Sequence, residues 1–218
     1  MAEGPGRRVS GAAGHRARAV AVFCGAKPGS DPRFLALARR TGALLAASGA
    51  TLVYGGGHVG MMGALADAAL AEGGEVVGVI PAVLMGREVG HTGLTRLEVV
   101  PDMAVRKQRM IELADAFLTL PGGLGTLDEL FEVLTLRQLG EHARPIVVVD
   151  DGGYFGALRA CLDGFVEHGL AAAHDVAALE SVPTPEAALE RLGLAAPRRA
   201  TGPDPGASPR PPLSRDRR

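Results

Sequence analysis

The stretch from Ala116 to Glu129 constrains the fold more than any other part of this sequence. It begins with a short apolar run that ends at Pro121, continues through a glycine-rich turn, and ends with the composition of a helix start. Proline cannot donate a hydrogen bond to a sheet, so Pro121 closes a buried strand. Glycines allow a sharp turn and a close approach to a ligand. We therefore predict a strand, a turn and a helix, a corner whose unpaired N–H groups bind phosphate or another anion.

Thr126 and Glu129 allow two interpretations of this corner. Thr126 is expected to cap the helix, which places Glu129 in the first helical turn with its carboxylate facing the ligand cleft. The same Thr-x-x-Glu spacing is also that of a capping box, in which the glutamate only returns a hydrogen bond to the cap. The motif alone does not choose between catalysis and capping.

The rest of the chain alternates apolar runs with helical patterns. Helices are expected from Pro32, after a cap at Asp31, and from Met103 to Leu113, after a cap at Asp102. This alternation predicts an α/β fold of the Rossmann-like type, an open parallel sheet flanked by helices on both faces. The expected strands are 20–23, 51–54, 76–80, 97–100, 117–120, 146–149 and, more weakly, 176–182.

Three of the glycine-rich turns follow the carboxyl ends of strands, where an open parallel sheet binds its ligands. A phosphate-bearing small molecule is therefore the leading ligand. The candidate contacts in these turns are Gly25, Gly56, Gly57, Gly122, Gly123, Leu124, Gly125 and Thr126.

Length and composition favour a single domain over residues 19–195 between two basic tails. The chain has 218 residues, of which 47% are hydrophobic. Residues 1–18 carry four Arg and one Glu, residues 196–218 carry six Arg and two Asp, and the segment between them holds a net charge of −8. We expect both tails to be disordered because they contain few apolar residues. The acidic remainder argues against a nucleic-acid surface.

The number of cysteines and the hydropathy of the sequence indicate in which cellular compartment the protein works. Cys24 and Cys161 are too few for a disulfide framework and lack the spacing of a metal site, and no apolar run approaches the length needed to cross a bilayer. We predict a cytoplasmic protein with no metal and no membrane partner.

Other phosphate-binding motifs fit poorly. Gly55-x-Gly57-x-x-Gly60 matches a dinucleotide fingerprint, but the strand that follows ends without the acid that would hold a ribose. No turn carries a Walker lysine. The only lysines are Lys27 and Lys107, and Lys107 adjoins Arg106, which suits an anion better than a Schiff base. What remains is a pair of acids, Glu88 and Glu129, beside the Arg106-Lys107 pair, a combination suited to glycosidic bond cleavage.

Four motifs together resemble the LOG family, the cytokinin riboside 5′-monophosphate phosphoribohydrolases, also labelled possible lysine decarboxylases. The resemblance covers residues 19–193. The motifs are Pro121-Gly122-Gly123-Leu124-Gly125-Thr126-Leu127-Asp128-Glu129, Gly55-Gly56-Gly57-His58-Val59-Gly60-Met61-Met62-Gly63, Arg87-Glu88-Val89-Gly90-His91 and Met103-Ala104-Val105-Arg106-Lys107.

The resemblance implies hydrolysis of the N-glycosidic bond of a 5′-mononucleotide to a free base and ribose 5-phosphate, without a cofactor and by a homodimer. It implies that Arg106 and Glu129 are catalytic, and that Glu88, Lys107, the turn 123–128 and Thr135 line the nucleotide site. A non-catalytic nucleotide-binding module and a broader purine or pyrimidine mononucleotide nucleosidase remain alternatives.

Two departures from the family pattern bear on the substrate. The family often has a histidine where Ala104 or Val105 stands here. Its first turn commonly reads Cys-Gly-Ser-Ser, whereas this chain has Lys27 at the fourth position, so that an ammonium is the candidate replacement for a hydroxyl donor.

Overall fold

A computed structural model describes residues 18–85 and 90–194 of the chain. The predictions for the two tails fall almost entirely outside this range, as does the predicted contact Glu88. None of the described helices is long and apolar enough to cross a bilayer.

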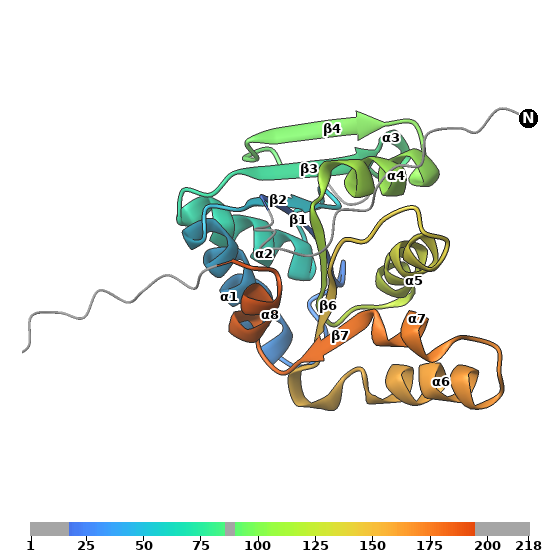
Figure 1. Cartoon of the computed structure of the whole chain (residues 1–218). Helices are drawn as coiled ribbons and strands as arrows, with labels where there is room; N and C mark the ends of the chain where they lie inside the picture. The colour runs from blue at the N-terminus through green and yellow to red at the C-terminus, as the bar shows by residue number, and fades with distance from the viewer. Residues whose placement is uncertain (1–17, 86–89, 195–218) are drawn as a thin grey trace, which may run out of the picture.

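The described strands form one parallel sheet, which confirms the predicted fold class (Figure 1). Its order is β4-β3-β2-β1-β5-β6-β7. The strands are β1 (Ala19–Phe23), β2 (Thr51–Tyr54), β3 (Val76–Pro81), β4 (Arg96–Val100), β5 (Ala116–Thr119), β6 (Ile146–Val149) and β7 (Leu179–Val182).

The winding direction reverses next to β1. The chain runs outward from β1 to β4, then returns to place β5 against the other side of β1, with Val20 opposite Ala116 and Phe23 opposite Thr119. At such a switch point the turns that leave two neighbouring strands go to opposite faces of the sheet, and a crevice opens between them.

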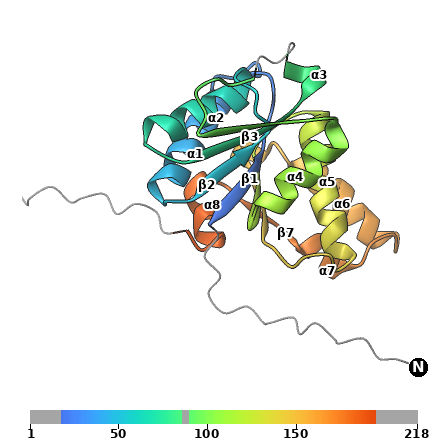
Figure 2. The same cartoon turned by 90° about the horizontal axis from the view of Figure 1, so that it is seen from above.

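Helices cover both faces of the sheet (Figure 2). One face packs against α1 (Arg33–Ala47), α2 (Gly60–Ala71) and α8 (Pro185–Arg191). The other packs against α4 (Met103–Leu113), α5 (Leu124–Gln138), α6 (Gly156–Glu167) and α7 (Ala173–Ala177). Two single-turn elements, α3 (Ala82–Leu84) and the 3₁₀ turn η2 (Asp151–Gly153), complete the order.

The strands alternate their side chains between two cores. In β1, Val20 and Val22 belong to the cluster under α1 and α2, while Ala21 and Phe23 belong to the cluster under α4 and α5. A strand that is buried on both faces needs apolar residues at every position, which is why short uninterrupted apolar runs mark this sheet.

The predicted helix starts are correct in one case and one residue off in another. Asp102 caps α4, and its carboxylate accepts a hydrogen bond from Val105 N at 2.9 Å. The first helix begins at Arg33 rather than at Pro32, which is itself the N-cap, and Asp31 accepts from Arg33 N at 2.9 Å.

The weak strand expected over 176–182 is two elements. Its first residues belong to α7, and only Leu179–Val182 pair with β6. Val176 and Leu179 are both buried in the same core, one from the helix and one from the strand. The apolar pattern over 176–182 therefore predicts burial correctly, but it predicts the secondary structure of the first residues incorrectly.

Candidate active site

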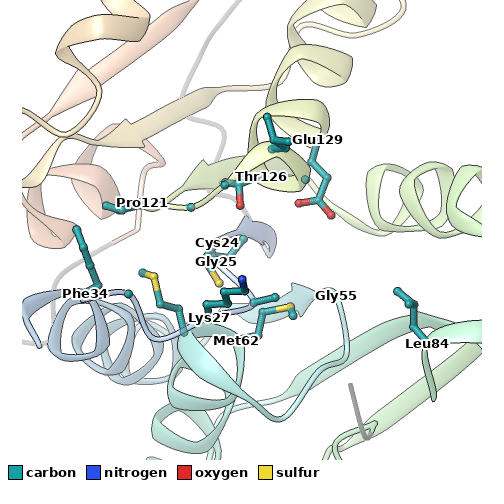
Figure 3. A pocket seen from close by; sticks show the side chains of 18 of the residues that line it. Cys24, Gly25, Lys27, Phe34, Gly55, Met62, Leu84, Pro121, Thr126 and Glu129 are labelled. Carbon is teal, nitrogen blue, oxygen red and sulfur yellow. The ribbon is translucent and has the colours of Figure 1, made fainter. Parts of the chain in front are cut away.

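A cavity of about 550 Å³ opens at the carboxyl ends of β1, β2 and β5, at the switch point of the sheet (Figure 3). Its walls combine the turns that follow these strands with side chains from α1, α2 and α4. Among the predicted contacts, Gly25, Arg106, Glu129 and every residue of 122–126 line it.

The first turn of α5 forms one wall, and it begins earlier than predicted. Gly123 is the N-cap, and no side chain caps the helix. Thr126 therefore lies inside the first turn with its side chain buried, and Glu129 lies in the second turn. The predicted cap at Thr126 and its capping-box interpretation are both wrong.

The open start of α5 leaves backbone donors for a ligand. The first intrahelical bond runs from Leu127 N to Gly123 O at 3.1 Å, so the N–H groups of Leu124, Gly125 and Thr126 have no partner within the helix. A Cβ added to Gly122 would overlap Thr126 Oγ1, so only glycine lets the turn pack this tightly. These donors and the positive end of the helix dipole suit an anion.

Arg106 is held by the ends of two strands. Its Nε donates to Val79 O and its Nη2 donates to Gly55 O, each at 3.1 Å. A Cβ added to Gly55 would occupy the place of Arg106 Nη2. The glycine after β2 is therefore needed for the arginine to reach its position, and the guanidinium is fixed by main-chain carbonyls.

Glu129 faces this guanidinium across 3.9 Å, measured from Arg106 Nη1 to Glu129 Oε1. The side chains are only 8% and 10% exposed. Burial raises the pKa of Glu129 from 4.5 to about 7, against the opposing effect of Arg106. A carboxyl group with a pKa near neutrality in a cavity is typical of a catalytic acid or base.

The thiol of Cys24 also lines the cavity, but it is not ionised and is therefore a poor nucleophile. Burial raises its pKa well above the ordinary range, and the nearby Glu129 raises it further. Cys24 therefore packs as a neutral, small apolar group, in agreement with its place in the core.

Four predicted contacts lie in the described chain but do not line the cavity. Gly56 accepts a hydrogen bond from His91 N, and Gly57 forms an isolated bridge with Gly90. Lys107 Nζ lies 3.0 Å from both Asp128 Oδ2 and Glu132 Oε2, and so links α4 to α5. Thr135 is exposed further along α5. Their roles toward a substrate remain predictions.

Several lining residues went unrecognised in the sequence. Tyr154 donates from its hydroxyl to Gly122 O at 2.6 Å, and its ring meets Phe34 edge to face at 5.5 Å between centroids. The only sequence signal for Tyr154 is its place shortly after a predicted strand. The others are apolar side chains that carry no sequence signal of a ligand contact: Phe34, Met61, Met62, Leu84 and Met103.

Comparisons with known proteins show which family the chain resembles in sequence. The model of a family described as possible lysine decarboxylase matches residues 62–192. The cytokinin riboside 5′-monophosphate phosphoribohydrolase of Rhodococcoides fascians is 48% identical over 168 residues, which cover 74% of this chain and 85% of that protein. A protein of the same name from Mycobacterium tuberculosis is 51% identical over 150 residues, covering 69% and 80%.

Solved structures add a likeness of fold. The molybdenum cofactor carrier protein of Chlamydomonas reinhardtii superposes with a TM-score of 0.61 at 18% identity, covering 79% of this chain and 93% of that one. This similarity concerns the architecture alone. The sequence matches are far stronger, and by them this chain belongs to the LOG family, whose model carries the description possible lysine decarboxylase.

Proposed function

We propose that this protein hydrolyses the N-glycosidic bond of adenosine 5′-monophosphates, including those with an N6 substituent, and releases the free base and ribose 5-phosphate. The activity is that of a cytokinin riboside 5′-monophosphate phosphoribohydrolase or an AMP nucleosidase. The observation that carries the proposal is the buried pair of Glu129 and Arg106 in a cavity that ends at the open first turn of α5. The names of the relatives support it.

In the proposed reaction, the first turn of α5 and Glu129 contact different parts of the substrate. The free N–H groups of the first turn of α5 hold the 5′-phosphate. Glu129, one helical turn further on, faces the sugar, where a carboxylate stabilises the positive charge that develops at C1′. The bond from C1′ to the base breaks, its electron pair leaves with the base, which takes up a proton, and water supplies the new hydroxyl on C1′.

Arg106 has a supporting part in this scheme. Its guanidinium favours the ionised form of Glu129, because an opposite charge lowers the pKa that burial raises. Among the described residues that line the cavity, Arg106 is the cation that pairs with Glu129. We assign the two residues to catalysis as a pair.

The apolar part of the cavity bears on the base. Met61, Met62 and Met103 line it together with Leu84. Methionine side chains are flexible and adapt to ligands of different shape. This lining supports a pocket for a purine that carries an apolar N6 substituent.

The test is the release of free base from a panel of nucleotides: AMP, N6-isopentenyl-AMP, GMP, CMP and UMP. We expect base from the two adenine nucleotides and little from the others. Comparable release from all five would favour a broader mononucleotide nucleosidase. Binding of AMP without any release of base would instead indicate a non-catalytic nucleotide-binding module.

We also propose that the protein is a cytoplasmic homodimer without nucleic-acid or membrane partners. The family resemblance supports the dimer. An exposed apolar side chain on an edge strand also supports it, because Val99 on β4 is 54% exposed. The acidic balance of the chain between its tails disfavours nucleic acid.

A further inference from the structure

Lys27 brings a positive charge to the cavity that no group in the described chain neutralises. Among the described residues, the charged side chains that line the cavity are Lys27, Arg106 and Glu129. Arg106 is engaged by two carbonyls and by Glu129. Lys27 is exposed and forms no hydrogen bond or ion pair within residues 18–85 and 90–194. An unpaired ammonium in a cavity is available to a ligand.

The backbone places Lys27 close to the glycine turn that precedes α5. Gly25 N donates to Pro121 O at 3.2 Å, so the turn after β1 lies against the turn after β5. On its other side, the carbonyl carbon of Lys27 lies 2.7 Å from the position of a Cβ built on Gly60, the first residue of α2. Lys27 therefore lies between the starts of α2 and α5.

The side chain faces the first turn of α5 across the cavity. Figure 3 shows Lys27 on the wall opposite Thr126 and Glu129. A phosphate monoester carries a charge of about −1.5 to −2 near pH 7 and three strong acceptor oxygens. The free N–H groups of α5 supply only the partial charge of a helix end, and an ammonium on the facing wall supplies a full one.

We propose that Lys27 binds the 5′-phosphate of the substrate and makes the site selective for nucleotides over nucleosides. The inference rests on the proposed function and names a residue for one part of it. The base and the ribose carry no charge for an ammonium to neutralise, so the phosphate is the part of the substrate that matches Lys27. A hydrogen bond to a charged group changes affinity by about tenfold to a hundredfold.

The experiment compares three variants with the wild-type protein. Lys27→Met removes the charge and keeps most of the chain length, and Lys27→Arg keeps the charge. Arg39→Met removes a positive charge from an exposed position of α1 away from the cavity and serves as the matched control. Calorimetry measures binding of ribose 5-phosphate and of ribose, and a base-release assay gives kcat/KM for AMP and for adenosine.

We expect Lys27→Met to weaken binding of ribose 5-phosphate by about tenfold to a hundredfold and to lower kcat/KM for AMP by a similar factor. Binding of ribose and turnover of adenosine should stay unchanged, as should every property of Arg39→Met, and Lys27→Arg should resemble the wild type. Unchanged binding of ribose 5-phosphate by Lys27→Met would overturn the proposal. So would an equal loss for AMP and adenosine. The binding measurement needs no hydrolysis, so a wild-type protein that binds ribose 5-phosphate but releases no base would refute the proposed function and still decide the role of Lys27.

Discussion

At the scale of single residues, the site depends on an acid whose pKa is shifted by burial. Glu129 lies beside a fixed guanidinium, yet the loss of water around its carboxylate outweighs that attraction and brings its pKa to about 7. Near neutral pH the carboxylate and the neutral acid are both populated. The protonation of this one group should therefore control the reaction over the physiological range.

This shift predicts a pH profile. In the proposed reaction the carboxylate form stabilises positive charge at C1′, and the fraction of this form increases as the pH rises through about 7. We expect kcat/KM for AMP to increase between pH 6 and pH 8 and to level off above that. The second ionisation of the phosphate, with a pKa of about 6, is nearly complete by pH 7, so an increase that continues above pH 7 reports on Glu129. A profile that is already flat from pH 6 upward would show that Glu129 has an ordinary pKa or a different role.

A second prediction concerns Gly55, which has no chemical role of its own. In Gly55→Ala the new methyl group would displace the Arg106 guanidinium. A displacement of about 1 Å in an active site can reduce turnover by about a hundredfold, and we expect a loss of that order in kcat/KM.

Gly164→Ala provides the control for this substitution. Gly164 lies in α6, away from the cavity, and a Cβ there meets nothing within 4 Å. This variant should keep full activity and melt no lower than the wild type, since alanine favours a helix. Full activity of Gly55→Ala would contradict the account of how Arg106 is held.

At the scale of elements, the start of a helix can be predicted from the sequence where a side chain caps it, and not where the cap is missing. Asp102 is recognisable as a cap from the sequence because aspartate is a common N-cap residue, and its carboxylate accepts the hydrogen bond from Val105 N in the first turn of α4. The start of α5 was misplaced because it has no side-chain cap. A capping side chain at Gly123 would occupy the N–H groups that we propose for the phosphate. A prediction that looks for a capping side chain therefore misses the start of a helix whose N–H groups are kept for a ligand.

The turn before α5 is supported from outside by Tyr154. Its hydroxyl holds the carbonyl of Gly122. In a trans peptide the C=O and N–H groups point in opposite directions, so this bond also orients the N–H of Gly123. The rings of Phe34 and Phe155 fix the tyrosine by edge-to-face contacts.

Tyr154→Phe tests this support with little change in packing. Loss of one hydrogen bond of about 0.5–1.5 kcal/mol should raise KM for AMP by about two- to tenfold, and kcat should change little. Steady-state kinetics separates the two constants, and adenosine, which lacks the phosphate, should show no change. An unaltered KM for AMP would mean that the turn keeps its shape without the tyrosine.

At the scale of the whole molecule, the architecture could be predicted and the composition of the cavity could not. Six of the seven strands lie within one or two residues of their predicted positions, and five of these, all but the edge strand β4, are buried on both faces and marked by continuous apolar runs. The cavity wall, in contrast, combines Phe34, Leu84 and Tyr154 from elements that are far apart in the sequence. These residues lie close together because of the order of the strands in the sheet. That order cannot be read from the residue pattern of a single sequence.

The proposed dimer yields a prediction for the whole molecule. Analytical ultracentrifugation should give a mass of twice the 22.4 kDa of one chain. If the exposed edge strand β4 forms the interface, Val99→Lys should shift the protein toward the monomer. Leu170→Lys, at a residue 78% exposed after α6, is the matched control and should leave the mass unchanged. A monomeric wild-type protein would refute the dimer, and a dimeric Val99→Lys would exclude this interface.

The central claim, that Glu129 acts on the sugar of a bound nucleotide, is tested most directly by Glu129→Gln. Burial places the folded-state pKa above the unfolded value, so ionisation of Glu129 destabilises the fold as the pH rises through about 7, and the Gln variant should melt no lower than the wild type at pH 8. Release of base from N6-isopentenyl-AMP should fall by roughly 10²- to 10⁴-fold, with binding of ribose 5-phosphate retained. A folded Glu129→Gln protein that releases base at the wild-type rate would contradict the account.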